Sequence, residues 1–183
     1  MEIEPNIIVY HCNDIERCDI FLEKKDYMIE SKEDGIWLGE GMYFWDNYSN
    51  ANYWLHEKER KDTQDKQFSI IKGNAIISKI LDLTDFDICN TFEKIWRLYA
   101  NKVGIDINIP LGKKINFLFD NVTFVRDAYD VIKIHGKYNR TPENDLYRYN
   151  IHSTQTEPTL NVKTIYSVRK NDCLFNFKYY REE

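Results

Sequence analysis

The sequence has no long apolar run, few glycines and prolines, and no excess of positive charge. No stretch approaches the roughly 20 consecutive apolar residues that a membrane-spanning helix needs. The seven glycines and four prolines do not gather into a low-complexity linker. Residues 1–5 are acidic, whereas a secretory signal begins with basic residues. We therefore expect an intracellular, cytoplasmic protein that is not associated with a membrane.

The four cysteines are scattered, without a C-x-x-C pair or a histidine at metal-ligand spacing: Cys12, Cys18, Cys89 and Cys173. Neither a zinc site nor a disulfide framework follows from such spacing. We expect four reduced thiols and no bound metal.

The net charge of -5 excludes a uniformly basic surface of the kind that holds nucleic acid through its phosphates. The charge is uneven, because residues 1–66 carry 16 acidic and 8 basic side chains while residues 67–183 carry 14 acidic and 17 basic ones. A solvated, mixed surface is the simpler interpretation of this small excess. A local basic face in the second part of the chain stays open.

The length and composition favour one folded domain over residues 1–183. A chain of 183 residues with 43% hydrophobic content can bury a substantial core, and two independent domains would be cramped. The aromatic content of 15% suits β structure and equally suits a pocket that stacks on a planar ligand.

Hydrophobic spacing predicts a mixture of strands and helices, and hence an α+β fold. Helices are expected to begin near residues 15 and 50 and to cover residues 91–102. Strands are expected at residues 7–11, near 42, at 68–71 and 75–81 around Gly73 and Asn74, and at 122–125, 129–134, 164–168 and 173–180.

Three short motifs occur together near the start of the chain. His11 ends the first expected strand, a Gly-x-Gly-x-Tyr-Phe run covers residues 39–44, and Ser49-Asn50-Ala51-Asn52-Tyr53 opens a helix. A histidine that closes a strand or a tyrosine on a helix is ordinarily structural, and a lone Gly-x-Gly is weak evidence. In this order and spacing, however, the motifs resemble the ADP-ribosyltransferases of the diphtheria-toxin and poly(ADP-ribose) polymerase type.

The run Trp37-Leu38-Gly39-Glu40-Gly41-Met42-Tyr43-Phe44-Trp45 is similar to a signature of bacterial members of that superfamily. Such members are often encoded in toxin or phage-defence contexts. The resemblance therefore implies split antiparallel β-sheets around an NAD cleft with flanking helices. It also implies a toxin or defence effector that an antitoxin would restrain.

The chemistry of NAD gives a reason for these residue types. A flat carboxamide ring needs a stacking face, a ribose needs a hydrogen-bond partner, and a pyrophosphate needs close backbone approach. The resemblance implies that Tyr43 and Tyr53 sandwich the nicotinamide, and that His11 bonds a ribose hydroxyl. Glycines let the backbone bend beside them, and the backbone of Cys12 would meet the carboxamide. The full set implied for NAD binding is His11, Cys12, Asn13, Gly41, Tyr43, Asn50 and Tyr53.

Transfer chemistry needs a carboxylate near the ribose, which stabilises the cationic transition state or activates the acceptor. If Val168-Arg169 and Cys173-Leu174 are matched to the bacterial relatives, the resemblance implies that the catalytic polar position falls near Ile165. Gln155-Thr156-Glu157 resembles the Gln-x-Glu motif of other branches, although Pro158 after it would remove a strand donor. Glu157 is therefore the candidate catalytic carboxylate beside His11 and Tyr43.

Asp130 is a weaker candidate for this carboxylate, and we expect His135 and His152 to be surface or structural residues.

The sequence thus predicts an NAD-dependent mono-ADP-ribosyltransferase, a glycosyltransferase whose acceptor is a protein or a nucleic acid. A catalytically silent module that binds NAD or ADP-ribose, or that serves as an interaction partner, is the alternative that Ile165 favours. An NAD glycohydrolase, which transfers to water, is the third interpretation.

Overall fold

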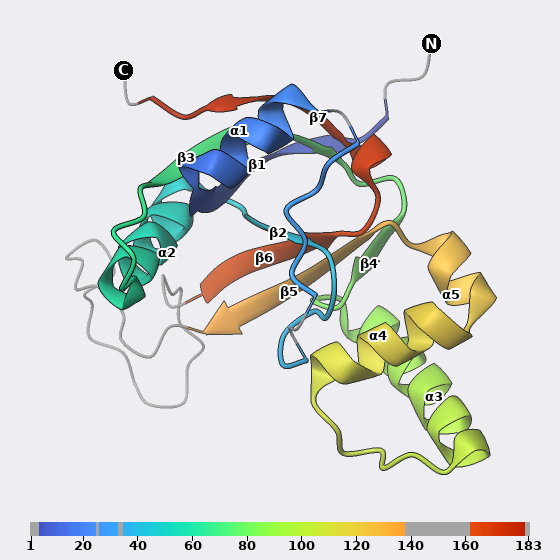
Figure 1. Ribbon diagram of the computed structural model, residues 1–183. Coiled ribbons are helices and arrows are strands. Elements are labelled where there is room, and N and C mark those ends of the chain that lie inside the picture. Colours follow the sequence, from blue (N-terminus) through green and yellow to red (C-terminus); the bar gives the residue numbers. More distant parts are fainter. Residues whose placement is uncertain (1–3, 25, 33–34, 138–161, 182–183) are drawn as a thin grey trace, which may run out of the picture.

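The computed structural model describes residues 4–24, 26–32, 35–137 and 162–181 (Figure 1). Five α-helices and seven β-strands occur in these residues, so the predicted α+β class is confirmed. None of the described helices is both long enough and apolar enough to cross a membrane.

The strands are β1 (Asn6–Asp14), β2 (Met42–Trp45), β3 (Phe68–Ile76), β4 (Ile80–Asp82), β5 (Val131–Lys137), β6 (Val162–Val168) and β7 (Leu174–Tyr179). The helices are α1 (Ile15–Glu23), α2 (Tyr48–Lys61), α3 (Phe86–Val103), α4 (Leu111–Asn121) and α5 (Thr123–Ala128). The helices predicted near residues 15, 50 and 91–102 are therefore confirmed.

Side-chain caps explain where two of these helices begin. The carboxylate of Asp14 accepts a hydrogen bond from the backbone N–H of Arg17 at the start of α1. The amide oxygen of Asn47 accepts one from the N–H of Asn50 at the start of α2. Each cap satisfies a backbone donor that has no partner inside the helix.

The seven strands form one sheet in the order β4-β5-β6-β2-β1-β3-β7. All neighbours are antiparallel except β4 and β5, which are parallel. The expectation of antiparallel sheets is therefore wrong at this edge. A parallel pair needs a long crossover, and here the connection between β4 and β5 contains the helices α3, α4 and α5.

The sheet has two parts that meet at a single residue pair. β1 pairs with β3 over nine residues, but it pairs with β2 only where Tyr10 lies opposite Trp45. Beyond this pair, β1 and β2 are no longer paired, so the part containing β1, β3 and β7 diverges from the part containing β2, β6, β5 and β4. This divergence places the candidate site described below.

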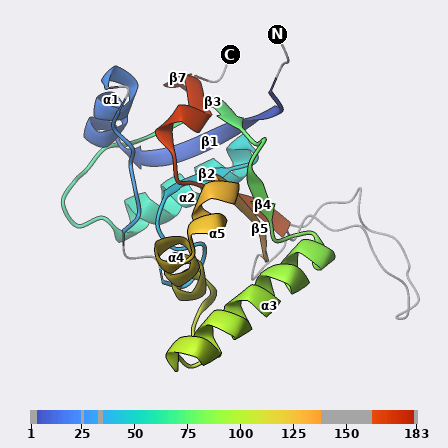
Figure 2. The ribbon, with the colours of Figure 1, turned by 90° about the vertical axis from the view of Figure 1, so that its right-hand side faces the viewer.

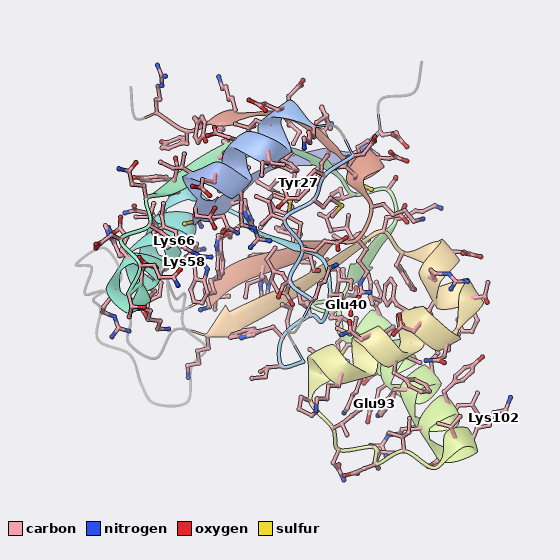
Figure 3. The ribbon with its side chains drawn as sticks, viewed as in Figure 1. Tyr27, Glu40, Lys58, Lys66, Glu93 and Lys102 are labelled. Carbon is pink, nitrogen blue, oxygen red and sulfur yellow. The ribbon has the colours of Figure 1, made fainter. Side chains whose placement is uncertain are left out.

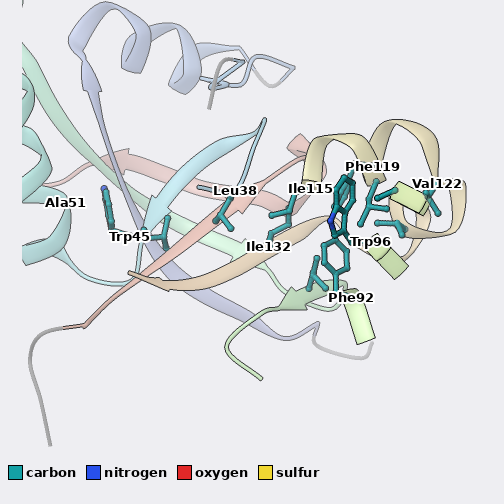
Figure 4. Packing of buried hydrophobic residues seen from close by; sticks show 14 of the residues in the cluster. Leu38, Trp45, Ala51, Phe92, Trp96, Ile115, Phe119, Val122 and Ile132 are labelled. Atoms are coloured by element: carbon teal, nitrogen blue, oxygen red, sulfur yellow. The ribbon is translucent and has the colours of Figure 1, made fainter. Parts of the chain in front are cut away.

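Alternate residues of the strands pack into two hydrophobic clusters on opposite faces of the sheet, as the period of a strand requires. Phe44 and Ile71 pack with Phe21 of α1 on one face, whereas Trp45 and Ile70 belong to the cluster on the other. That second cluster continues through Phe92, Trp96, Ile115 and Phe119 of α3 and α4 (Figure 4). Helices α3, α4 and α5 gather at one end of the molecule, away from α1 and α2 (Figures 1 and 2).

Two local predictions are wrong. The expected strand break at Gly73 and Asn74 does not occur: β3 continues through both residues to Ile76, and the strand expected at 75–81 is instead interrupted before β4 begins at Ile80. Gly73 is needed there for packing: a Cβ atom would lie 2.5 Å from the ring of Phe177 on β7. The strand expected at residues 122–125 is helical, with Val122 and Val125 buried three residues apart as one face of a helix requires.

Candidate functional site

A pocket of about 250 Å³ opens where β1 and β2 diverge. Three consecutive residues of β1 line it, together with aromatic side chains from β2, α2 and the loop before β2. The lining residues are His11, Cys12, Asn13, Ser31, Trp37, Tyr43, Trp45, Trp54, Lys58, Lys163 and Ile165.

The imidazole of His11 joins β1 to β2 next to the point where the pairing of the two strands ends. Its Nδ1 lies 2.6 Å from the backbone carbonyl oxygen of Tyr43. A carbonyl oxygen only accepts, so Nδ1 carries the proton and donates. Nε2 is then an acceptor, and the side-chain amide nitrogen of Asn13 lies 3.3 Å from it. His11 is thus held with its acceptor nitrogen directed to Asn13.

Burial keeps this imidazole neutral. Removal from water lowers the pKa of His11 from its ordinary value of 6.5 to about 4, and the hydrogen bond to the Tyr43 carbonyl opposes the shift only in part. At neutral pH, His11 is therefore an uncharged group with one donor and one acceptor nitrogen. Such a group suits recognition of a hydroxyl.

Tyr43 holds the preceding loop with its hydroxyl. The oxygen accepts a hydrogen bond from the N–H of Leu38 at 2.9 Å and donates one to the carbonyl of Gly39 at 2.8 Å. The loop is thereby folded back over the tyrosine, and Trp37 is brought to the mouth of the pocket.

Both glycines of the Gly-x-Gly motif have backbone conformations that other residues rarely adopt. Gly39 has a φ angle of 73° and Gly41 one of 132°. A Cβ atom on Gly41 would lie 2.3 Å from the hydroxyl oxygen of Ser167 on β6. These positive φ angles give a backbone reason for glycine at both positions.

Helix α4, which the hydrophobic pattern did not predict, supports this loop from outside. The Asn116 side-chain oxygen accepts hydrogen bonds from the N–H of Glu40 and from the guanidinium of Arg169, both at 2.8 Å. Asn116 also approaches Gly39 so closely that a Cβ atom there would lie 2.1 Å from it. Residues far apart in sequence therefore fix the loop's shape.

Trp37 and Trp45 form an aromatic slot in the pocket, which we call the tryptophan slot. The ammonium group of Lys163 lies 5.4 Å from the ring centre of Trp37 and 5.6 Å from that of Trp45. Aromatic faces attract cations, so the slot already holds one positive charge. The absence of a side chain at Gly136 leaves space for the Lys163 side chain, because a Cβ atom there would lie 2.9 Å from Lys163 Cε and 3.1 Å from Trp37 Cζ3.

A second depression of about 340 Å³ shares Asn13, Trp54 and Lys58 with the first. Arg17 and Lys66 also line this second depression, which we call the basic extension. Figure 3 shows Lys66 near Lys58 of α2. Burial, and to a smaller extent the charge of Arg17, lowers the pKa of Lys58.

The acidic residues around the basic extension already have internal partners. Asp14 caps α1, Glu57 pairs with Arg60 and Lys61, and Asp62 accepts from the backbone of Gln64 and Lys66. In the described part of the chain, neither Lys58 nor Arg17 forms an ion pair with these carboxylates, although the charge of Asp14 acts to raise the pKa of Lys58.

The thiol of Cys12 is not a nucleophile at neutral pH. Burial raises its pKa to about 12, so the sulfur stays protonated. The four cysteines are free, and in the described part of the chain no three His, Cys, Asp or Glu side chains gather into a metal site.

The structure brings four of the predicted binding residues together at the pocket: His11, Cys12, Asn13 and Tyr43. Gly41 shapes the loop without lining the pocket, and Asn50 is buried and donates to Asp46 at 2.7 Å. Tyr53 is half-exposed on α2, and its neighbour Trp54 is the aromatic residue that faces the pocket.

Sequence reasoning did not assign Trp37, Trp54, Lys58 or Lys163 to the site. The helical spacing of Trp54 and Lys58, four residues apart, was the signal that could have paired them.

Ile165 lies in the pocket wall, paired with Trp45 on one side and with Ile134 on the other. Gln155, Glu157 and His152 lie outside the described residues. Asp130 forms an ion pair with Lys170 and does not line the pocket. His135 is exposed on β5, in agreement with the predicted surface role.

The sequence was compared with those of known proteins, and the comparison found a similar archaeal protein. An uncharacterized protein of Methanocaldococcus jannaschii is 27% identical over 171 residues, which covers 84% of this chain and 79% of the relative. No protein-family model matches the chain, and no solved structure matches it. The chain is thus similar to an archaeal protein whose name states no activity.

Proposed function

We propose that the pocket binds NAD and that the protein transfers ADP-ribose from it to an acceptor. The observation that carries this proposal is the convergence of a neutral histidine, an aromatic slot that holds a cation, and a continuous basic extension. These three features match the ribose, the nicotinamide and the pyrophosphate of one molecule.

The tryptophan slot suits the charged ring of the oxidised cofactor. The nicotinamide ring of NAD is a flat cation, and a cation between two tryptophan faces is what the ammonium of Lys163 already supplies. The ring would displace that ammonium and stack in its place. The uncharged ring of the reduced cofactor would lose this attraction, so oxidised NAD is the expected ligand.

The basic extension suits the pyrophosphate. Lys58 lines both depressions, so a molecule with its ring in the tryptophan slot can reach Lys58 and Arg17 with its phosphates. Charge-assisted hydrogen bonds to phosphate are stronger than neutral ones. A ribose hydroxyl between the two ends would donate to Nε2 of His11, sharing or replacing the Asn13 amide.

In the proposed reaction, the bond between the nicotinamide nitrogen and C1 of the ribose breaks, and nicotinamide leaves as a neutral molecule. The acceptor's nucleophile forms a new bond to C1 and loses a proton. As nicotinamide leaves, positive charge develops on the ribose at C1, and a nearby negative charge would stabilise this transition state. Glu157 is our candidate for that carboxylate.

A silent binding module is the second candidate function, and the lining of the pocket favours it. Ile165 stands at the position where transfer would place a polar group, and none of the described lining residues is acidic. Such a module would hold NAD without breaking it.

Calorimetric titration with NAD and NADH, combined with an assay for released nicotinamide, tests the proposal. Trp37→Ala should weaken NAD binding about tenfold, the order expected for loss of one aromatic cation contact. Ile36→Ala, at the exposed neighbouring residue, is the matched control and should leave affinity unchanged. Absence of NAD binding by folded wild-type protein would overturn the proposal.

Nicotinamide release separates the candidate activities. Release that needs an acceptor indicates a transferase, release into water indicates a glycohydrolase, and binding without release indicates the silent module. Glu157→Gln should abolish release while leaving NAD affinity unchanged, if Glu157 supplies the carboxylate.

A further inference from the structure

A row of side chains crosses the sheet from the pocket to its β7 edge. The strand registers place Trp45 opposite Tyr10, Tyr10 opposite Lys72, and Lys72 opposite Lys178. Residues that pair across strands lie on the same face. The row therefore leads from a residue that lines the pocket to two lysines at the edge of the sheet.

The β7 end of this row is basic and aromatic. A wide depression there is lined, among the described residues, by Lys72, Lys178, Tyr179, Tyr180 and Arg181. The ammonium of Lys72 lies 5.7 Å from the ring centre of Tyr10 and 5.9 Å from that of Tyr180. We call this set of residues, with Tyr10, the β7 surface.

Among the described residues, the β7 surface gathers three cationic side chains, Lys72, Lys178 and Arg181. Like charges directly opposite one another in a sheet are destabilising, yet Lys72 and Lys178 occupy such a pair. In the part of the chain that the structure describes, neither these lysines nor Arg181 forms an ion pair. An external anion would relieve the repulsion.

From this arrangement we infer that the β7 surface binds single-stranded nucleic acid. The cations would contact successive phosphates. The half-buried rings of Tyr10 and Tyr180 pack against each other, and that of Tyr180 also packs against Tyr48. Their remaining exposed surface would contact bases, as in proteins that hold single strands without reading their sequence. An acidic protein segment would form ion pairs with the cations, but it would have no bases to stack on the tyrosine rings. A rigid duplex would present phosphates while keeping the flat faces of its bases stacked inside.

The row of paired residues connects the β7 surface to the proposed NAD pocket. A strand lying across Lys178, Lys72 and Tyr10 ends beside Trp45, which lines the pocket. The β7 surface would then position a nucleic-acid acceptor, an assignment that rests on the proposed transfer, whereas the binding itself does not.

Fluorescence anisotropy of labelled 12-nucleotide oligo-dT and oligo-U, without NAD, tests the binding. Lys72→Glu/Lys178→Glu should weaken it at least about tenfold at low salt, because two phosphate contacts are lost and repulsion is added. Lys94→Glu/Lys102→Glu makes the same change of net charge on exposed residues of α3, and Figure 3 shows Lys102 far from the strands. This control should stay within about twofold of wild type.

A second pair, Lys178→Glu/Arg181→Glu, changes only exposed side chains and should weaken binding similarly even if the Lys72 variant does not fold. Equal losses in the α3 control would overturn the inference, and so would absence of oligonucleotide binding by wild type. Polyglutamate competing as well as oligo-dT would also overturn it and indicate an acidic protein partner. Because NAD is absent, none of these results depends on the proposed transferase activity.

Discussion

The imidazole Nδ1 of His11 lies 2.6 Å from the carbonyl oxygen of Tyr43, and this side-chain contact connects β1 to β2 beyond the residue pair at which the two strands meet. The hydrogen bond fixes the tautomer of His11 and spans the opening of the pocket. A stability measurement can detect it, because a buried neutral histidine makes folding depend on pH.

We expect the free energy of unfolding to fall as the pH decreases from 6.5 to about 4. In this range His11 is protonated in the unfolded chain but is still neutral in the folded protein, so protonation favours unfolding. Over that range His11 should contribute a loss of about 3 kcal/mol in the free energy of unfolding. Urea unfolding of wild type and His11→Gln at pH 7 and pH 4.5 isolates this contribution from that of the carboxylates. Identical losses in the two proteins would show that His11 titrates normally.

Tyr43→Phe should loosen the loop that carries Trp37 while keeping the aromatic ring. The N–H of Leu38 and the carbonyl of Gly39 both lose a partner, at a cost of about 1 to 2 kcal/mol. Urea unfolding and NAD titration measure the two effects, and affinity should fall with stability. Tyr129→Phe, after α5 and away from the pocket, is the control.

Gly41→Ala should destabilise the fold by about 2 kcal/mol or more, because strain and a steric clash act together. Gly104→Ala is a matched control: its φ angle is 75°, but a Cβ atom there has no neighbour within 4 Å. The control should therefore cost only about 1 kcal/mol. Equal shifts in thermal unfolding would mean that contact with Ser167 adds nothing.

Gly136→Ala should disturb the tryptophan slot more than the fold. The new Cβ would press on the flexible end of Lys163 and on the edge of Trp37, so the loss of stability should stay near 1 kcal/mol or below. Tryptophan emission should shift, and NAD should bind more weakly. Unchanged NAD affinity with a shifted emission spectrum would remove the slot from the binding site.

Local signals explain which features could be predicted from the sequence. Asp14 and Asn47 cap the helices that follow them, and Gly39 and Gly41 have the positive φ angles that make glycine necessary. His11 and Tyr43 share the pocket because each belongs to a strand that was recognisable by itself. Each of these features can be recognised from residues that are close together in the sequence.

The remaining features depend on contacts between distant parts of the chain. Asn116 supports the loop from a helix that had not been predicted, and Gly136 admits Lys163 to the slot from a neighbouring strand. The parallel pairing of β4 with β5 brings together residues about 50 positions apart. Hydrophobic periodicity reports which face of an element is buried, but it does not report the element against which it packs.

The position of β6 between β2 and β5 affects how the protein is made. Phe44 pairs with Tyr166, so a ribosome must synthesise more than 120 further residues before β2 acquires this neighbour. Until then, β2 and β5 each expose an edge that other chains can pair with. Folding through such distant contacts is slow, and a nascent or truncated chain that ends before β6 should depend on chaperones to avoid aggregation.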